Sequence, residues 1–240
     1  MKKAFTMLEL VFVIVIIGIL AAVIIPNTRS NPVHEAALQL VNHIRYTQHL
    51  AMINDTYDAS DSQWYKAKWQ LVFTFNNNFA NNQPSYTIFL DEGAYGGNPT
   101  FSEIAKNPEN IDQLMTGGYG ANKLDINDDD FVGMKKMNLG ITYGITSVSY
   151  TSPSCSNTSP TATYPSLRVS FDHLGRPIKG KNSSMTSPYN ISIPFNPAKQ
   201  RLITSDCNIT ITNGSETAII KIVPETGFTC ILNATGNNCI

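Results

Sequence analysis

The feature that most constrains this chain is an almost wholly apolar run from Phe5 to Ile25, which is followed by Pro26. About 20 apolar residues in a helix are enough to cross the hydrocarbon core of a bilayer. Residues 1–3 (Met-Lys-Lys) are basic, and basic residues beside a membrane span stay on the cytoplasmic side. We therefore expect a single transmembrane helix at residues 5–25, with the N-terminus cytoplasmic and the remainder on the opposite side.

One carboxylate, Glu9, interrupts this apolar run. An ionisable residue inside a membrane-length helix is costly and usually functional. A secretory signal peptide would have a shorter apolar core and small residues before its cleavage site. Here the one plausible cut, after Ala22, has Leu20 where a small residue belongs. The run is therefore predicted to be kept as an anchor, and the residues alone leave the role of Glu9 open.

A second helix is predicted beyond the proline, over residues 26–54, as an amphipathic continuation of the first. Pro32 suits a first helical position, with Asn31 before it as the cap. Apolar or small residues then recur at spacings of three and four, which is typical of one buried helix face: Val33, Ala37, Leu40, Val41, Ile44, Thr47 and Ala51. We expect the two helices to form one long, locally bent rod whose upper half packs on a sheet.

From residue 55 to residue 240 the pattern changes to short β-branched and aromatic runs between turn residues, which is typical of antiparallel strands. The expected strands cover residues 68–76, 85–91, 140–151, 166–172, 190–196, 208–213 and 217–224. Residues 91–138 lack this pattern and are predicted to be a long surface insertion, with a short helix near residues 103–115. The expected fold class is therefore α+β, with a long N-terminal helix, transmembrane in its lower half, packed on an antiparallel sheet domain with long loops.

Charge and motifs exclude several classes of function. The formal net charge is −1 and charged residues make up 15% of the chain, so there is no bulk electrostatic case for nucleic acid. The densest basic cluster, Arg176, Lys179 and Lys181, leaves phosphate contact as an alternative. No nucleophile elbow, phosphate loop, zinc-protease motif or dinucleotide fingerprint occurs. We expect a protein that is not an enzyme.

The four cysteines, Cys155, Cys207, Cys230 and Cys239, all lie in the C-terminal part of the chain. An even number without metal-site spacing is typical of disulfides in an oxidising compartment. Three pairings are possible, and four buried free thiols are the alternative. We favour Cys155–Cys207 and Cys230–Cys239, because the second pair closes a short C-terminal loop.

An acidic stretch within residues 123–136 places Asp125, Asn127 and Asp129 at the first, third and fifth positions of a calcium loop. Asp130 stands where such a loop has Gly, and Lys136 stands where it has Glu. These two differences exclude a complete EF-hand. The remaining hypotheses are a looser calcium site built from oxygen ligands and a solvated acidic turn.

The N-terminus resembles that of the type IV pilin and type II secretion pseudopilin family. The resemblance rests on the short basic leader of residues 1–4, on Phe5 and the following Thr-Met-Leu-Glu-Leu, and on the apolar run with Gly18 and Pro26. It implies that a prepilin peptidase cuts between Ala4 and Phe5 and methylates the new amine. It also implies that Glu9 meets the N-terminal amine of a neighbouring subunit. The family usually has Gly where this chain has Ala4, so we expect slower cleavage.

Two further segments resemble the H-type minor pseudopilins and related minor pilins: residues 168–179, which contain Phe-Asp-His-Leu-Gly-Arg, and residues 220–230, which contain Thr-Gly. The end of the second helix, at residues 41–52, is similar to theirs as well. The resemblance implies a structural subunit of a type IV pilus or a type II secretion pseudopilus, anchored by a single pass in the inner membrane with its head periplasmic. Its implied partners are other subunits, the prepilin peptidase and the membrane assembly platform. The alternative is a filament-delivered binding module for DNA or a secreted substrate.

Overall fold

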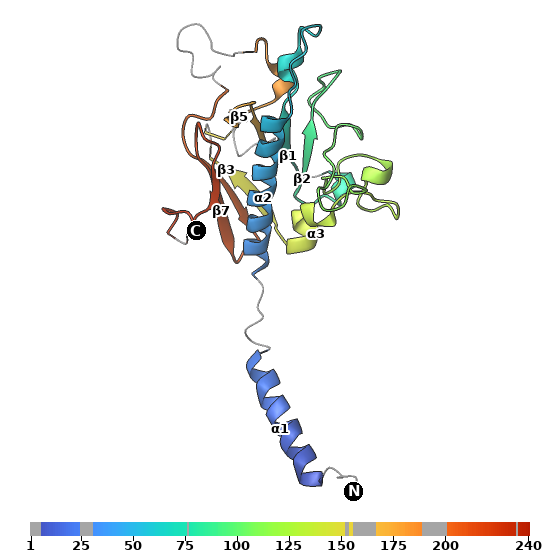
Figure 1. Ribbon diagram of the computed structural model, residues 1–240, viewed down its shortest axis with the longest axis vertical. Coiled ribbons are helices and arrows are strands. Elements are labelled where there is room, and N and C mark those ends of the chain that lie inside the picture. Colours follow the sequence, from blue (N-terminus) through green and yellow to red (C-terminus); the bar gives the residue numbers. More distant parts are fainter. Residues whose placement is uncertain are drawn as a thin grey trace. The chain divides into compact units, whose positions relative to one another are not determined.

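The computed structural model describes residues 6–24, 31–75, 77–151, 154–155, 167–188, 201–233 and 235–240. The chain divides into two compact units, Met1–Asn31 and Pro32–Ile240 (Figure 1). The second unit is called the sheet domain below. The fold is α+β with antiparallel sheets, which confirms the coarse part of the predicted fold class.

The first unit contains one helix, α1 (Met7–Ile24). Its 18 residues make about 27 Å of helix at 1.5 Å per residue, whereas the hydrocarbon core of a bilayer is about 30 Å thick. Within the described part of the chain, no helix is both long enough and apolar enough to cross a membrane. The predicted long N-terminal helix with a transmembrane lower half is therefore wrong. The same finding contradicts the predicted single-pass location in the inner membrane.

The second helix, α2 (Pro32–Ile53), opens the sheet domain and is the amphipathic helix that the spacing predicts. Its first residue is a proline, whose fixed φ suits the first turn and whose missing N–H costs nothing there. Every residue of the predicted apolar stripe is buried, and Ala36 joins them. The buried face packs against residues of both sheets in one hydrophobic cluster.

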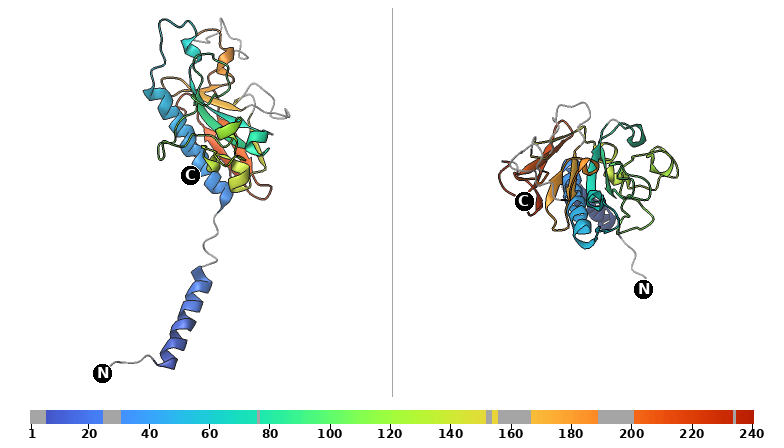
Figure 2. Two further views of the ribbon diagram at one scale, coloured as in Figure 1. Left: turned by 90° about the vertical axis from the view of Figure 1, so that its right-hand side faces the viewer. Right: turned by 90° about the horizontal axis from the view of Figure 1, so that it is seen from above.

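Within the described residues, eight strands form two four-stranded sheets. The first sheet has the order β2-β1-β4-β5 and the second has the order β3-β6-β7-β8. Figure 2 shows the sheets from two further sides. All neighbouring strands in the two sheets are antiparallel. The strands are β1 (Trp69–Thr74), β2 (Ser85–Leu90), β3 (Ser147–Tyr150), β4 (Arg168–Phe171), β5 (Pro177–Lys179), β6 (Cys207–Thr212), β7 (Thr217–Ile222) and β8 (Thr229–Ile231).

Short helices connect these strands. One is the single-turn α3 (Leu139–Tyr143), which Gly144 ends in the left-handed region at φ 68°. The others are the 3₁₀ helices η2 (Trp64–Lys66), η3 (Asn78–Ala80), η4 (Asn122–Leu124), η5 (Lys135–Met137) and η6 (Asn182–Ser184).

The strand predictions hold for most of the sheet domain, with three differences. The first half of the predicted strand 140–151 is α3, because Asn138 caps a helix there by accepting a hydrogen bond from the Ile141 N–H at 2.9 Å. The three-residue strands β5 and β8 carry too few residues to show an alternation, and the sequence analysis missed both. The predicted strand 190–196 lies outside the described residues.

Residues 91–138 cover the face of the first sheet that points away from α2. They contribute side chains to a second hydrophobic cluster that has its own core, formed by Val72, Phe89, Ile104, Leu114 and Leu124. Residues 103–115 contain no helix; isolated bridges Phe89↔Ile104 and Thr87↔Thr116 attach the segment to β2 instead. The predicted short helix is wrong, and the insertion is a structural layer, which closes one face of the sheet.

Candidate assembly site

The start of α1 is a reciprocal pair of caps between Thr6 and Glu9. A carboxylate oxygen of Glu9 accepts hydrogen bonds from the Thr6 N–H and from the Thr6 hydroxyl, each at 3.0 Å. The Glu9 N–H in turn donates to the Thr6 hydroxyl oxygen at 3.3 Å. This arrangement is a capping box, which satisfies two donors that the first turn of a helix leaves free. Glu9 therefore has a partner within its own chain, and Thr-x-x-Glu is the sequence signal that could have found it.

The surface of α1 is apolar on every side. The exposed fraction of its large apolar side chains runs from 41% at Ile16 to 84% at Met7. Eight consecutive residues, 10–17, belong to this set, and eight residues make more than two turns of helix. A helix of this composition has no polar face for water, and in native assemblies such a helix is buried. The processing residues Ala4 and Phe5 lie outside the described residues, so the predicted cleavage and methylation stay predictions.

Gln48 connects α2 to two hairpin turns of the sheet domain. It lies on α2, within residues 41–52, and its side-chain N–H₂ donates to two carbonyl oxygens, each at 2.8 Å. One carbonyl belongs to Gly175, in the turn between β4 and β5, and the other to Thr226, in the turn between β7 and β8. A single amide thus ties one hairpin of each sheet to the helix.

The close approach at this junction requires glycine. Gly175 and Gly227 have φ values of 78° and 67°, in the left-handed region. A Cβ at Gly227 would lie 2.6 Å from the Gly175 carbonyl oxygen and 2.6 Å from the Gln48 amide nitrogen. Both distances are shorter than any real Cβ contact, so a side chain at Gly227 would separate the two hairpins from the helix.

Asp172 holds the first of these turns. Its carboxylate accepts hydrogen bonds from the backbone N–H groups of Leu174 and Arg176, at 3.0 and 2.8 Å. The Arg176 guanidinium adds an ion pair at 2.7 Å. Lys179, in the adjacent strand β5, is buried. Of the three cations in the predicted basic cluster, Lys181 is the exposed one, so the structure gives no continuous basic surface there.

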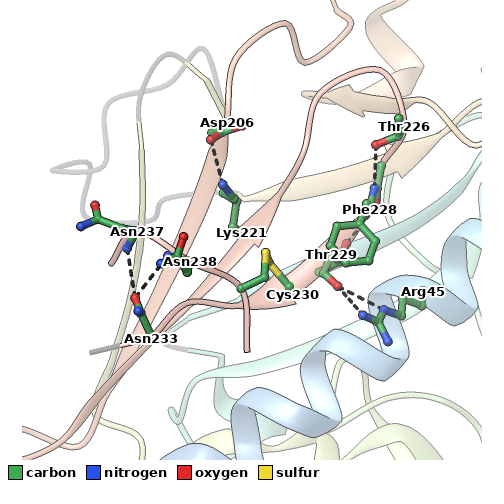
Figure 3. The surroundings of a disulfide bond; sticks show 12 residues. Arg45, Asp206, Lys221, Thr226, Phe228, Thr229, Cys230, Asn233, Asn237 and Asn238 are labelled. Atoms are coloured by element: carbon green, nitrogen blue, oxygen red, sulfur yellow. Dashed lines mark hydrogen bonds and ion pairs between the residues drawn. A yellow bond between two sulfur atoms is a disulfide. The ribbon is translucent and has the colours of Figure 1, made fainter. Parts of the chain in front are cut away.

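The closing strand β8 is attached to α2 by Arg45, as Figure 3 shows. The guanidinium donates two hydrogen bonds to the Thr229 carbonyl oxygen, at 2.7 and 3.1 Å. It also lies over the ring of Phe228, 5.6 Å from the ring centroid, which is cation–π geometry. Asn233 orders the loop that follows, because its side-chain oxygen accepts the backbone N–H groups of Asn237 and Asn238.

The disulfides follow the favoured pairing. Cys155 is bonded to Cys207, and Cys230 is bonded to Cys239. The first bond attaches the segment after β3 to the start of β6, and the second closes the C-terminal loop onto β8. The predicted pairing is therefore confirmed, and the alternative of four free thiols is excluded.

A directional chain of hydrogen bonds, partly buried and centred on the buried Tyr86, lies between α2, β2 and α3. The Tyr143 hydroxyl donates to the Gln39 side-chain oxygen at 2.8 Å, and the Gln39 side-chain nitrogen donates to the Tyr86 hydroxyl oxygen at 2.7 Å. The Tyr86 hydroxyl lies 2.7 Å from Nδ1 of His43. Burial lowers the pKa of His43 to about 4 and raises the pKa of Tyr86. The Tyr86 O–H therefore donates to a neutral imidazole. The sequence analysis missed this network, since polar residues off an apolar stripe give no signal of burial.

The predicted calcium ligands are arranged as an ordinary turn. The Asp125 carboxylate accepts hydrogen bonds from the backbone and side-chain nitrogens of Asn127, at 2.9 and 2.7 Å. The Asn127 side-chain nitrogen also donates to the Asn78 carbonyl at 3.2 Å. The amide therefore directs its nitrogen, not its oxygen, toward Asp125, and this arrangement does not converge three oxygens. Across the described residues, no group of three or more His, Cys, Asp or Glu side chains could hold a metal ion. Calcium at Asp125, Asn127 and Asp129 stays a prediction.

Comparison with known proteins gives no match: no family model, no curated protein and no solved structure is significantly similar to this chain.

Proposed function

We propose that this chain is a structural subunit, a minor pilin or pseudopilin, of a type IV pilus or secretion pseudopilus, and that it joins neighbouring subunits through α1. The observation that carries the proposal is the surface of residues 7–20 of α1, whose exposed large side chains are apolar around the whole helix. The resemblance of residues 5–10 to the start of type IV pilins supports it.

The apolar surface of α1 is stable only when it is buried from water, and helices of neighbouring subunits can bury it. Full burial of one large apolar side chain contributes about 1.5–3 kcal/mol. Twelve such side chains between Met7 and Leu20 are exposed, so their burial contributes on the order of 10 kcal/mol or more, enough to offset the entropy lost on association. Gly18 has no atom within 4 Å of the position a Cβ would take, which leaves room for close approach of a second helix.

Glu9 would fix how far neighbouring α1 helices are shifted along one another. After cleavage before Phe5, a neighbouring subunit would present an ammonium group at the same end of the helix. The Glu9 carboxylate accepts the Thr6 donors through one oxygen, and none of the described residues donates a hydrogen bond to its second oxygen. A charged amine can therefore pair with the carboxylate without breaking the capping box, and a charge-assisted hydrogen bond is stronger than a neutral one.

Three substitutions separate the capping role of Glu9 from the intersubunit role. Glu9→Gln keeps an oxygen for the Thr6 donors and removes the charge. Thr6→Val removes the Thr6 hydroxyl and keeps the carboxylate. Glu35→Gln, in the first turn of α2, is the matched control for loss of one exposed carboxylate. Each variant replaces the wild-type gene, and the amount of the protein in sheared filaments is measured by immunoblot against total protein.

We expect Glu9→Gln to reduce incorporation strongly, and Thr6→Val and Glu35→Gln to leave most of it. Equal losses in the Glu9 and Thr6 variants would mean that Glu9 acts only as a helix cap. Normal incorporation of Glu9→Gln would refute the pairing. Mass spectrometry of the mature N-terminus is an independent check, because a chain that still begins at Met1 contradicts family membership.

A further inference from the structure

A cavity of about 460 Å³ lies in the sheet domain at the C-terminal end of α2. Its walls are the last turn of α2, the segment 54–57 that follows, the start of β1 and the end of β4. This volume is within the range of pockets that bind small molecules, which are typically aromatic with a few polar groups. Neither the filament proposal nor the family resemblance assigns any role to this place.

Four aromatic residues line the cavity: Tyr57, Trp64, Trp69 and Phe171. The rings of Tyr57 and Trp64 are 5.0 Å apart between centroids and nearly perpendicular, at 77°, so they form a corner. Trp69 begins β1 and Phe171 ends β4, and these two strands are paired neighbours. The tyrosine side chain is 62% exposed, so the corner is open to solvent and to a ligand.

The cavity wall contains one carboxylate, beside the side chains of Lys68 and His173. Asp55 lies in its wall, with one carboxylate oxygen accepting the Tyr57 N–H at 3.0 Å. The last turn of α2 contains no Lys or Arg, so the negative end of the helix dipole is not compensated within that turn. Lys68 also lines the cavity; burial lowers the pKa of its ammonium group, and the negative charge of Asp172 opposes that shift.

We propose that this cavity binds a small organic cation, with an alkylated ammonium group held in the aromatic corner and facing Asp55. The faces of Trp and Tyr rings attract such cations through the ring quadrupole, and perpendicular rings enclose a rounded cation on two sides. A carboxylate and a helix C-terminus nearby add attraction of the same sign. A neutral ligand of equal shape gains only the apolar part of this binding.

The two tryptophans of the chain are Trp64 and Trp69, and both line the cavity. Intrinsic tryptophan fluorescence of the full chain therefore reports on this place alone. The probe is choline, and the matched control ligand is neopentylcarbinol, the uncharged alcohol in which carbon replaces the quaternary nitrogen. We expect a saturable fluorescence change with choline and binding of the alcohol weaker by about tenfold. Binding could leave the fluorescence unchanged, so the chemical shifts of the two indole N–H groups in NMR spectra are a second measure of binding.

Two substitutions test the assignment. Asp55→Asn keeps the oxygen that accepts the Tyr57 N–H and removes the charge, so it should weaken choline binding about fivefold and leave the alcohol unaffected. Asp112→Asn removes another exposed carboxylate that does not line the cavity, and should change neither. Equal affinity for choline and the alcohol, or no response of either indole signal to choline, would overturn the proposal. These measurements use the unassembled chain, so their outcome does not depend on whether the chain forms filaments.

Discussion

His43 makes the stability of the sheet domain sensitive to mild acid. Its imidazole accepts a hydrogen bond from Tyr86, whose oxygen in turn accepts one from Gln39. Protonation of Nδ1 would replace an acceptor by a donor, and the Tyr86 O–H would lose its partner in a buried place. It would also bury a positive charge between α2 and β2. For these reasons burial lowers the pKa of His43 from 6.5 to about 4.

The size of the effect follows from the two pKa values. The unfolded chain binds a proton at His43 near pH 6.5 and the folded chain binds it near pH 4. Between these values the unfolded state holds more protons, so the free energy of unfolding falls as the pH is lowered through this window. At pH 5 the loss relative to pH 8 is about 2 kcal/mol. That is a large part of a typical domain stability of about 5–15 kcal/mol.

The assay is urea unfolding of the full chain between pH 8 and pH 4, for the wild type and two variants. His43→Gln removes the titrating group and keeps a side chain that can accept from Tyr86. His49→Gln is the matched control, because His49 is exposed on the same helix. The difference in unfolding free energy between wild type and His43→Gln should shift by about 2 kcal/mol from pH 8 to pH 5, in favour of the variant. Parallel curves for these two proteins would refute a buried neutral histidine.

Two further predictions concern the junctions of the sheet domain. Gln48→Ala removes both hydrogen bonds to the hairpin turns and should lower the free energy of unfolding by about 1–3 kcal/mol in urea; a change within error would mean that the turns hold themselves. Replacement of Cys155 and Cys207 by Ser opens a 52-residue loop and should cost about 4 kcal/mol, against about 2.5 kcal/mol for Cys230 and Cys239, whose loop has 9 residues. The reverse order in thermal unfolding of the two double variants would contradict the loop-entropy argument.

The helix α2 shows what local pattern can predict. Its buried face recurs every three or four residues, and burial of such a stripe does not depend on which sheet covers it. The complete predicted stripe is therefore buried. The strand β6 is similar: its alternation of apolar and polar residues matches the alternation of buried and half-buried side chains along it. In both elements one period decides the structure.

The insertion shows where this reasoning ends. Its cluster brings together Ile104, Leu114 and Leu124 with Val72 and Phe89 from the sheet. Apolar residues of the insertion do not recur with the spacing of a helix or a strand. Isolated bridges and turns hold the segment instead. Their burial comes from contacts between residues far apart in the sequence, which a local pattern does not contain.

The candidate assembly site was predicted in one part and missed in another. Glu9 stands out because a carboxylate in an apolar run is conspicuous, and its predicted partner was the N-terminal amine of another subunit. Thr6, three residues earlier, is a local partner of the kind that helix starts commonly use. Gln48 was missed for the opposite reason. It is polar and lies off the apolar stripe, so the pattern placed it toward solvent, whereas two hairpin turns end at its amide.

The capping box changes what the assembly of α1 has to supply. Without Thr6, the Glu9 carboxylate would be a bare charge at the start of an apolar helix, and burial would be costly until a neighbour's amine arrived. With Thr6, the carboxylate already has two donors in the single chain. In the proposed assembly, the amine of a neighbouring subunit would therefore add one more hydrogen bond to a carboxylate that already accepts two. In the proposed assembly the helix would keep the same conformation before and after association, the charge pair would select the register of the neighbour, and the apolar surface would supply most of the binding energy.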